Sequence, residues 1–125
     1  MGTGKQATLY TWDAIPREAL NPLIERQLVV GEQIMIGHIY LKKGAIVPLH
    51  HHVNEQMTYI LTGSLRFWLG ADEAEEVIVR SGQVLHLPSN LPHKAKALED
   101  TLDVDVFSPP RQDWINKTDD YLRGE

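Results

Sequence analysis

The sequence predicts an all-β fold, either a sandwich or a jelly-roll barrel, and three observations lead to that prediction. Glycine and proline recur along the chain, mostly five to ten residues apart. The segments between them are rich in Val, Ile, Leu and Tyr, which is typical of short antiparallel strands joined by tight turns. Segments such as 34–36 and 77–79 are apolar on both faces, which indicates a closed or double-layered sheet.

The chain divides into short strand-like segments and two helical ones. The expected strands are Thr8–Trp12, Glu25–Val30, Gln33–Lys42, Ala45–Leu49, Gln56–Leu61, Ser64–Leu69, Glu75–Val79, Gln83–Leu87, Lys94–Ala97 and Thr101–Phe107. Pro16–Leu20 has room for one helical turn. Arg111–Leu122 is expected to form a short C-terminal helix with Trp114, Ile115 and Leu122 facing inward.

Length and composition favour one globular domain over residues 1–125. The chain has 125 residues, 42% of them hydrophobic, so it can bury a small core. It has no cysteine, which excludes disulfides and thiolate metal sites. The formal net charge of -5, without a basic cluster, argues against binding to nucleic acid or to acidic lipid.

The N-terminal stretch lacks the basic start and long apolar run of a secretion signal, and no apolar segment is long enough to span a membrane. We therefore expect a cytoplasmic protein with no membrane partner.

Histidines at alternate positions form the first candidate site. On a strand, His50 and His52 point to the same face and His51 points away. Two imidazoles at that spacing can chelate a metal ion, and Gln56 can join them if the chain turns back after residue 54. His93 follows a proline-rich turn, on a later strand that can close over the first.

Other interpretations of these residues stay open. HxH is a short pattern with many chance matches, so the histidines could lie on the surface or in the core. Glu55 could be the fourth ligand if Gln56 faces away. We expect His38 and His86 to be structural, because each sits in an apolar strand without a partner at ligand spacing.

A second group of polar residues lies near the C-terminus. Asp103, Asp105 and Phe107 share one strand face, and buried carboxylates are costly without partners, which suggests a wet or functional cavity. The alternative is an edge strand with its carboxylates in solvent. Arg111 follows two prolines and suits bidentate recognition of a carboxylate. Its alternative is a surface ion pair with Asp113 or Glu18.

Two motifs in the middle of the chain resemble the paired motifs of the cupin superfamily. The first consists of Gly44, His50, His52, Gln56 and Gly63, and the second of Gly82, Pro88, Asn90 and His93. They span residues 44–63 and 82–93 in the order and spacing of that family. The resemblance implies a cupin jelly-roll β-barrel that holds one divalent metal ion through His50, His52, Gln56 and His93.

The motifs depart from the usual cupin pattern at three positions. Gln56 stands where glutamate is usual, Asn90 where glycine is usual, and Ala97 where asparagine is common. With Gln56, no ligand charge offsets the charge of the ion, which favours anionic ligands. The ligand set does not identify the metal, and Ni, Zn, Fe or Mn are all plausible, with Cu also compatible.

Residues 102–114, together with Pro48, Gln56 and Pro92, resemble the pectin-degradation cupins of the KdgF type over roughly residues 26–115. The resemblance implies an isomerase-like enzyme that converts 4,5-unsaturated monouronates, released from pectin or alginate, to linear 4-deoxy-5-keto uronates. It places catalytic or substrate-binding roles on Asp105, Phe107 and Arg111. Asp103 departs from the more usual apolar residue.

The expected chemistry has named roles and named alternatives. Asp105 is expected to transfer the proton, Arg111 to orient the substrate carboxylate, and Phe107 to pack against the sugar ring. A metal-dependent cupin dioxygenase and a non-catalytic sugar-binding cupin remain the alternative functions. We also expect a homodimer, because an exposed strand edge is a liability unless covered, and we expect the segment around Leu9–Trp12 to contribute to it.

Overall fold

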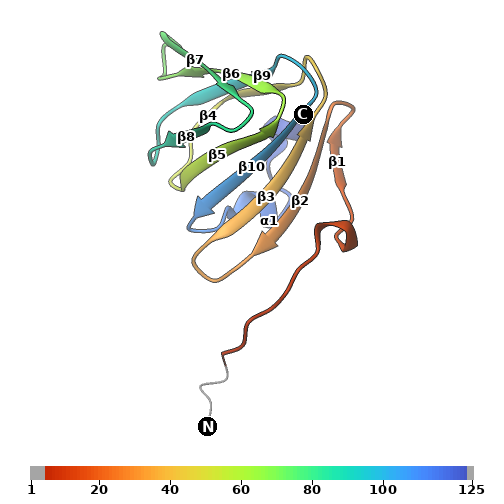
Figure 1. The fold of residues 1–125 in the computed structure, drawn as a ribbon. Coiled ribbons are helices and arrows are strands. Elements are labelled where there is room, and N and C mark those ends of the chain that lie inside the picture. The colour runs from red at the N-terminus through yellow and green to blue at the C-terminus, as the bar shows by residue number, and fades with distance from the viewer. Residues whose placement is uncertain (1–4, 124–125) are drawn as a thin grey trace.

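The computed structural model describes residues 5–123, and it contains two antiparallel β-sheets that face each other as a jelly roll (Figure 1). The larger sheet has the order β1-β2-β3-β10-β5-β8 and the smaller sheet β4-β9-β6-β7. The strands are β1 (Glu18–Asn21), β2 (Ile24–Val30), β3 (Met35–Leu41), β4 (Ile46–His50), β5 (Glu55–Thr62), β6 (Ser64–Leu69), β7 (Glu75–Arg80), β8 (Val84–Leu87), β9 (His93–Ala97) and β10 (Thr101–Ser108).

The core lies between the two sheets and consists of the inward residues of both. Met35 and Ile60 come from the larger sheet and Leu65 and Phe67 from the smaller one, and all four are at most 3% exposed. Burying one such side chain stabilises the fold by roughly 1.5–3 kcal/mol. The predicted all-β jelly roll is therefore confirmed, and the expected strands from residue 25 to residue 107 are present with small shifts at their ends.

The N-terminal region differs from the prediction in two places. Thr8–Trp12 forms no strand within the chain; a short 3-10 turn, η1 (Trp12–Ala14), follows instead. Pro16–Leu20 is not helical, because β1 occupies Glu18–Asn21 and pairs with β2 through Glu18 opposite Arg26. The weak helical propensity of a five-residue segment is overridden by this pairing.

The C-terminal segment forms two short helices where one was predicted. These are α1 (Gln112–Ile115) and α2 (Asp120–Arg123), and Lys117 between them has a positive φ of 58°, which ends the first helix. Trp114 and Leu122 face the core as expected, and Ile115 packs against it partly buried. Helix α2 contacts β1 and β4, the edge strands of the two sheets, and so bridges the gap between them.

Residues 5–11 extend away from the body of the molecule (Figure 1), and Leu9 is 94% exposed. The ring of Trp12 stacks on His38 with centroids 3.7 Å apart, which ties the end of this arm to β3. An extended arm that exposes Leu9 and Tyr10 is compatible with the predicted homodimer, which stays a prediction. Light scattering at micromolar concentration should give twice the chain mass; a monomer mass would contradict it.

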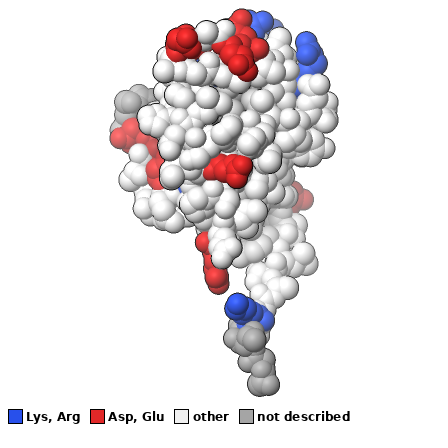
Figure 2. All heavy atoms as spheres, turned by 90° about the vertical axis from the view of Figure 1, so that its left-hand side faces the viewer, with Lys and Arg blue, Asp and Glu red and all other residues white. Residues whose placement is uncertain are grey.

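Charged side chains are scattered on the face of the molecule shown in Figure 2, where acidic residues stand apart on a largely uncharged surface. Lysine and arginine form no patch on that face among the described residues. Within residues 5–123, no helix is both long enough and apolar enough to cross a bilayer.

The turn between β5 and β6 depends on Gly63, which gives a testable prediction. Gly63 has a φ of 93°, and a Cβ added there would lie 2.5 Å from the Asp100 carbonyl oxygen. Gly44 has a similar φ of 90° but open space around it, so it is a matched control. In urea denaturation, Gly44→Ala should lower the free energy of unfolding by about 1–2 kcal/mol. Gly63→Ala should lower it by a further ~1–3 kcal/mol, and equal losses would contradict the steric argument.

Candidate metal centre

Three imidazoles from separate parts of the chain converge at one end of the barrel. His50 ends β4, His52 lies in the following loop, and His93 begins β9 directly opposite His50 in the sheet register. One ring nitrogen of each lies within 4.8 Å of those of the other two. The three residues could therefore hold a metal ion, as the spacing of the motifs predicts.

Backbone carbonyl groups fix the orientation of all three rings. The Nδ1 atoms of His50, His52 and His93 lie 2.7, 3.0 and 2.9 Å from the carbonyl oxygens of Pro48, Asn54 and Leu91, respectively. A carbonyl oxygen only accepts hydrogen bonds, so each Nδ1 carries the proton and donates it. Each Nε2 is then left with a free lone pair, which is the arrangement that a metal-binding histidine requires.

The surroundings keep these imidazoles neutral. Burial and the neighbouring His93 lower the pKa of His50 to about 3. Burial and the Arg111 guanidinium lower the pKa of His52 to about 4, and burial also lowers the pKa of His93. Metal binding at neutral pH therefore displaces no proton from these rings.

Gln56 completes the donor set, and its position supports a bound cation. The Gln56 Oε1 atom lies 3.1 Å from His52 Nε2, while Gln56 Nε2 donates to Thr58 Oγ1 at 2.8 Å. A neutral His52 has one N–H, which it gives to Asn54, so Oε1 and Nε2 face each other as two acceptors. A cation bound by both atoms relieves that conflict. The donor chemistry thus fits the metal ion that the motifs imply.

The remaining histidines and Glu55 lie elsewhere. Glu55 is exposed and its carboxylate lies 2.7 Å from His86 Nε2, away from the cluster. His51 is exposed as expected, and His38 stacks on Trp12. The structure therefore brings Gln56, and not Glu55, to the three histidines.

Asp105 and Asp103 form a buried carboxyl pair on β10. The Asp105 Oδ1 atom accepts a 2.8 Å hydrogen bond from Thr58, and both carboxyl groups are 5% exposed. Burial and the charge of Asp105 raise the pKa of Asp103 well above its usual range, and burial raises the pKa of Asp105. The raised pKa of Asp103 favours its protonated form, which can donate a hydrogen bond to Asp105.

Arg111 is buried, at 2% exposed, and nearly all its donors are accounted for. Its Nε and Nη2 atoms donate to the two carboxylate oxygens of Asp113 at 2.9 and 2.7 Å, and Nη2 also donates to the Tyr121 hydroxyl at 2.8 Å. Only Nη1 has no partner. The pairing with Asp113 that was left open as an alternative is present, so the bidentate fork is occupied and Nη1 alone is available to a ligand.

Phe107 packs against two residues of the site, His52 and Arg111. It is fully buried, its ring centroid lies 5.8 Å from that of His52, and the Arg111 guanidinium lies 5.3 Å from the ring. It does not line the cavity described next, so the structure does not place Phe107 where a sugar ring could pack against it.

Two hollows meet at the histidines. An inner cavity of about 40 Å³ is lined by apolar side chains and by a polar group of residues: His50, Gln56, His93, Asp105 and Arg111. Outside it lies an open groove of about 460 Å³ between residues 50–54 and residues 109–113. Ligand pockets usually occupy about 300–1,000 Å³, so the groove accommodates a small molecule and the inner cavity holds little more than water.

Comparison with known proteins agrees with this geometry. The cupin domain family (Cupin_2) matches residues 37–108, which is more than half of the chain. The chain is 34% identical over 77 residues to the oxalate decarboxylase OxdC of Bacillus subtilis (strain 168). That stretch covers 60% of this chain and 20% of the relative, so the chain spans about a fifth of the curated relative it matches.

Solved structures show the same fold. KdgF from Halomonas sp. matches with a TM-score of 0.78 and 27% identity, over 86% of this chain and 99% of that one. An RmlC-like cupin from Shewanella frigidimarina NCIMB 400 matches with a TM-score of 0.79 and 21% identity, over 87% of this chain and 96% of that one. The two-sheet barrel carries at its mouth a histidine cluster that could hold a metal ion. This chain belongs to the cupin domain family, and it is similar to KdgF over nearly the whole of that protein.

Two residues of the site were not anticipated from the sequence. Thr58 links Gln56 to Asp105, and its position two residues after Gln56 on the same strand face was the available signal. Tyr121, which stacks on His50 with centroids 4.5 Å apart, gave no signal, because its place depends on how the C-terminal segment folds back.

Removing the imidazoles tests the metal centre. The double variant His50→Ala/His52→Ala should lose bound metal, as measured by elemental analysis, because two of the converging Nε2 donors are gone. His51→Ala is the matched control, since His51 is the exposed residue between them, and it should retain metal. Far-UV circular dichroism should be unchanged in both variants. Full metal occupancy in the double variant would contradict the assignment.

Proposed function

We propose that this protein is a metal-dependent enzyme that opens 4,5-unsaturated monouronates and converts them to linear 4-deoxy-5-keto uronates. One observation carries the proposal. In a cupin similar to KdgF, the cavity beside the histidine cluster is also lined by Asp105 and by Arg111, whose buried Nη1 has no hydrogen-bond partner. These are a proton-transfer group and a cationic donor, the two groups that this isomerisation requires from the protein.

The reaction moves one proton and breaks one bond. The substrate is a cyclic hemiacetal whose ring oxygen is attached to a carbon–carbon double bond next to a carboxylate. Removal of the proton from the anomeric hydroxyl group forms the C1 carbonyl, breaks the bond between C1 and the ring oxygen, and leaves an enolate. Protonation at C4 then gives the 5-ketone, so no other reactant is consumed.

Asp105 is the proposed base and acid. Thr58 donates a hydrogen bond to it, and the raised pKa of Asp103 favours a protonated neighbour, so the Asp105 carboxylate is held in place to take the anomeric proton. The same proton can then be delivered to C4. Burial raises the pKa of Asp105, which makes it a stronger base than an exposed carboxylate.

The charges around the cavity favour an anionic substrate. Arg111 Nη1 can donate to one oxygen of the substrate carboxylate, while Asp113 holds the rest of the guanidinium in place. A divalent ion held by His50, His52, His93 and Gln56 would stabilise negative charge on the carboxylate and the developing enolate. Because Gln56 is neutral, none of that positive charge is cancelled by a ligand.

Paired variants of the two buried carboxyl groups test the proposal. With unsaturated galacturonate as substrate and loss of the conjugated double-bond absorbance as readout, Asp105→Asn should lower kcat by roughly a hundredfold or more. Asp103→Asn is the matched control, because the amide can still donate to Asp105 and Asp103 does not line the cavity. Its kcat should stay within about threefold of that of the wild type. Both variants should bind metal normally.

Arg111 should affect binding more than rate. Arg111→Ala should raise KM by roughly tenfold or more, the effect of losing a charge-assisted hydrogen bond. Several results would contradict the proposed function: full activity of Asp105→Asn, no chelator-sensitive turnover by the wild type, or oxygen consumption with the substrate. The last result would favour the dioxygenase alternative, and binding without turnover would favour a sugar-binding cupin.

A further inference from the structure

The groove and the inner cavity are separated by a wall of three side chains. Among the residues that line either hollow, only His50, Arg111 and Tyr121 line both. A ligand that enters from the groove therefore has to pass this wall to reach Asp105 and the inner side of the histidine cluster. Because the inner cavity has a volume of about 40 Å³, the wall also has to move for a sugar to fit.

Two of the three side chains are held firmly. His50 donates to the Pro48 carbonyl group at 2.7 Å and faces His93 with ring centroids 4.3 Å apart. Arg111 is paired through two hydrogen bonds with Asp113, and its guanidinium lies 5.3 and 4.8 Å from the ring centroids of Phe107 and Trp114. His50 cannot leave the wall without ceasing to be a metal ligand, and Arg111 cannot leave it without breaking its ion pair with Asp113.

Tyr121 is held more weakly. Its ring stacks on His50, and its hydroxyl oxygen accepts hydrogen bonds from Arg111 Nη2 at 2.8 Å and from Trp114 Nε1 at 3.1 Å. A substrate oxygen can replace the phenol oxygen at both donors. The free Nη1 of the same guanidinium lies beside them, so an anionic group could take two contacts on one cation.

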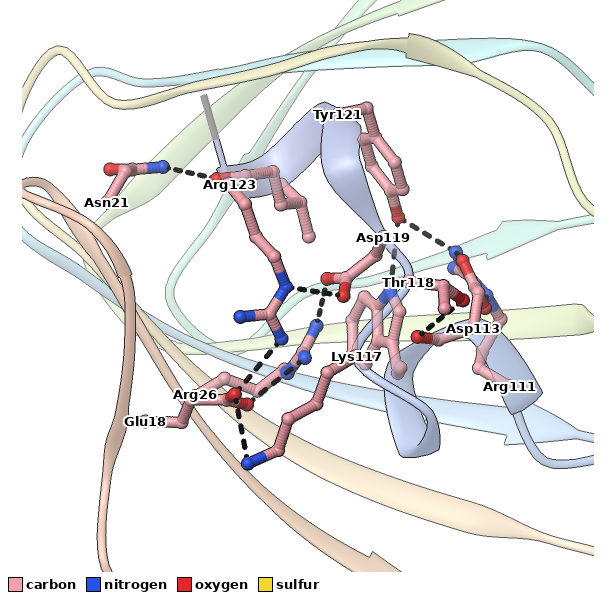
Figure 3. A network of polar contacts seen from close by, with 12 residues as sticks. Glu18, Asn21, Arg26, Arg111, Asp113, Lys117, Thr118, Asp119, Tyr121 and Arg123 are labelled. Atoms are coloured by element: carbon pink, nitrogen blue, oxygen red, sulfur yellow. Dashed lines mark hydrogen bonds and ion pairs between the residues drawn. The ribbon is translucent and has the colours of Figure 1, made fainter. Parts of the chain in front are cut away.

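The backbone that carries Tyr121 is fixed, as Figure 3 shows. Asp119 accepts a 2.6 Å hydrogen bond from Arg26, whose side chain has no solvent exposure, and a 3.0 Å bond from Arg123. The Leu122 carbonyl oxygen accepts a 2.8 Å bond from Asn21. Separating a buried ion pair typically costs about 3–5 kcal/mol, so rotation of the Tyr121 side chain requires less free energy than movement of α2.

We propose that Tyr121 is a specificity-determining residue, the displaceable part of this wall, which an anionic monosaccharide replaces at Arg111 to reach the metal side of the cavity. Neutral sugars gain nothing from Arg111 and leave Tyr121 in place, and the Tyr121 ring limits the size of the uronate that can enter. Residue 121 lies beyond the stretch that matches the cupin family, which ends at residue 108. The substrate-selection part of this inference rests on the proposed function, whereas the barrier in front of the metal does not.

Removal of bound metal by a chelator tests the barrier without any substrate. Protein loaded with Zn²⁺ is mixed with EDTA at several concentrations, and metal loss is followed for the wild type, Tyr121→Phe and Tyr121→Ala. The rate for Tyr121→Ala should exceed that of the wild type by about ten- to a hundredfold, because hydrogen bonds to a charged group favour the closed position by factors of that order. Tyr121→Phe, which keeps the ring and loses the hydroxyl group, should lie between them.

Tyr59→Ala is the matched control, because Tyr59 lies 40% exposed on β5, outside both hollows, and its rate should equal that of the wild type. At low EDTA concentrations the rates should be proportional to EDTA concentration, because the chelator then attacks the small fraction of molecules in which the wall is open. Rates independent of EDTA concentration would mean that Tyr121 only stabilises His50, and equal rates in all four proteins would mean that it is no barrier. Either result overturns the proposal.

Substrate size gives the second measurement. The wild type should turn over an unsaturated monouronate and not the unsaturated disaccharide, whereas Tyr121→Ala should accept both. If the wild type is inactive on every uronate, the proposed function fails and the EDTA rates still decide whether Tyr121 is the barrier. If the wild type is active and Tyr121→Ala shows no change in size preference, Tyr121 does not determine specificity. If Tyr121→Ala does not fold, Tyr121→Phe tests the proposal instead. This variant should lose metal to EDTA faster than the wild type and should have a lower KM for the monouronate.

Discussion

The double pairing of strand β10 is the constraint on which the rest of this structure depends. β10 hydrogen-bonds to β3 on one side and to β5 on the other, so its register cannot slip without breaking both ladders. This register sets Asp105 opposite Thr58 and Phe107 opposite Gln56. Arg111 leaves the end of the same strand. One strand therefore positions the carboxylate, the ring that supports the site, and the cation relative to the histidines.

A bound metal ion would make this site positive in an acidic protein, because the other charges of the site are largely compensated. The chain has a formal net charge of -5. Near the cavity, Asp113 is paired with Arg111, and the raised pKa of Asp103 favours its neutral form. The proposed metal ligands are all neutral. A bound divalent ion would therefore give the cavity a net positive charge, with Asp105 as its one anionic group.

Much of the fold was predictable from the sequence, because strand signals and motif spacing are local. The histidine cluster was predicted from the alternation of side chains at residues 50–52 and from the interval to residue 93. The same alternation along the strand favoured Gln56 over Glu55 as the fourth ligand. The errors have two causes. The segment that forms β1 is short, and its pairing with the neighbouring strand β2 overrides its weak helical propensity. The C-terminal segment bends back because Asp119 meets Arg26, 93 positions away, and no local pattern encodes such a contact.

The same limit applies to individual roles. Arg111 was expected to present its planar fork to a ligand, but Asp113 occupies the fork. Phe107 was expected to face a sugar, but it lies beneath the cavity wall. In both cases the residue type was informative about chemistry, whereas its direction depended on packing that only the folded chain defines.

The buried carboxyl pair also makes folding a proton-linked reaction. In the unfolded chain, Asp103 ionises near its ordinary pKa of about 4, whereas in the folded protein its pKa is raised well above that value. The folded state therefore takes up a proton that the unfolded state has released. The stability associated with this proton is fully present below about pH 4 and declines as pH rises through the folded-state pKa.

The neutral histidines act in the opposite sense. Because the pKa values of His50 and His52 are lowered in the folded protein, their contribution to folding stability is lost as pH falls below about 6.5. The metal-free protein thus has two opposed proton linkages, one arising from each half of the same site.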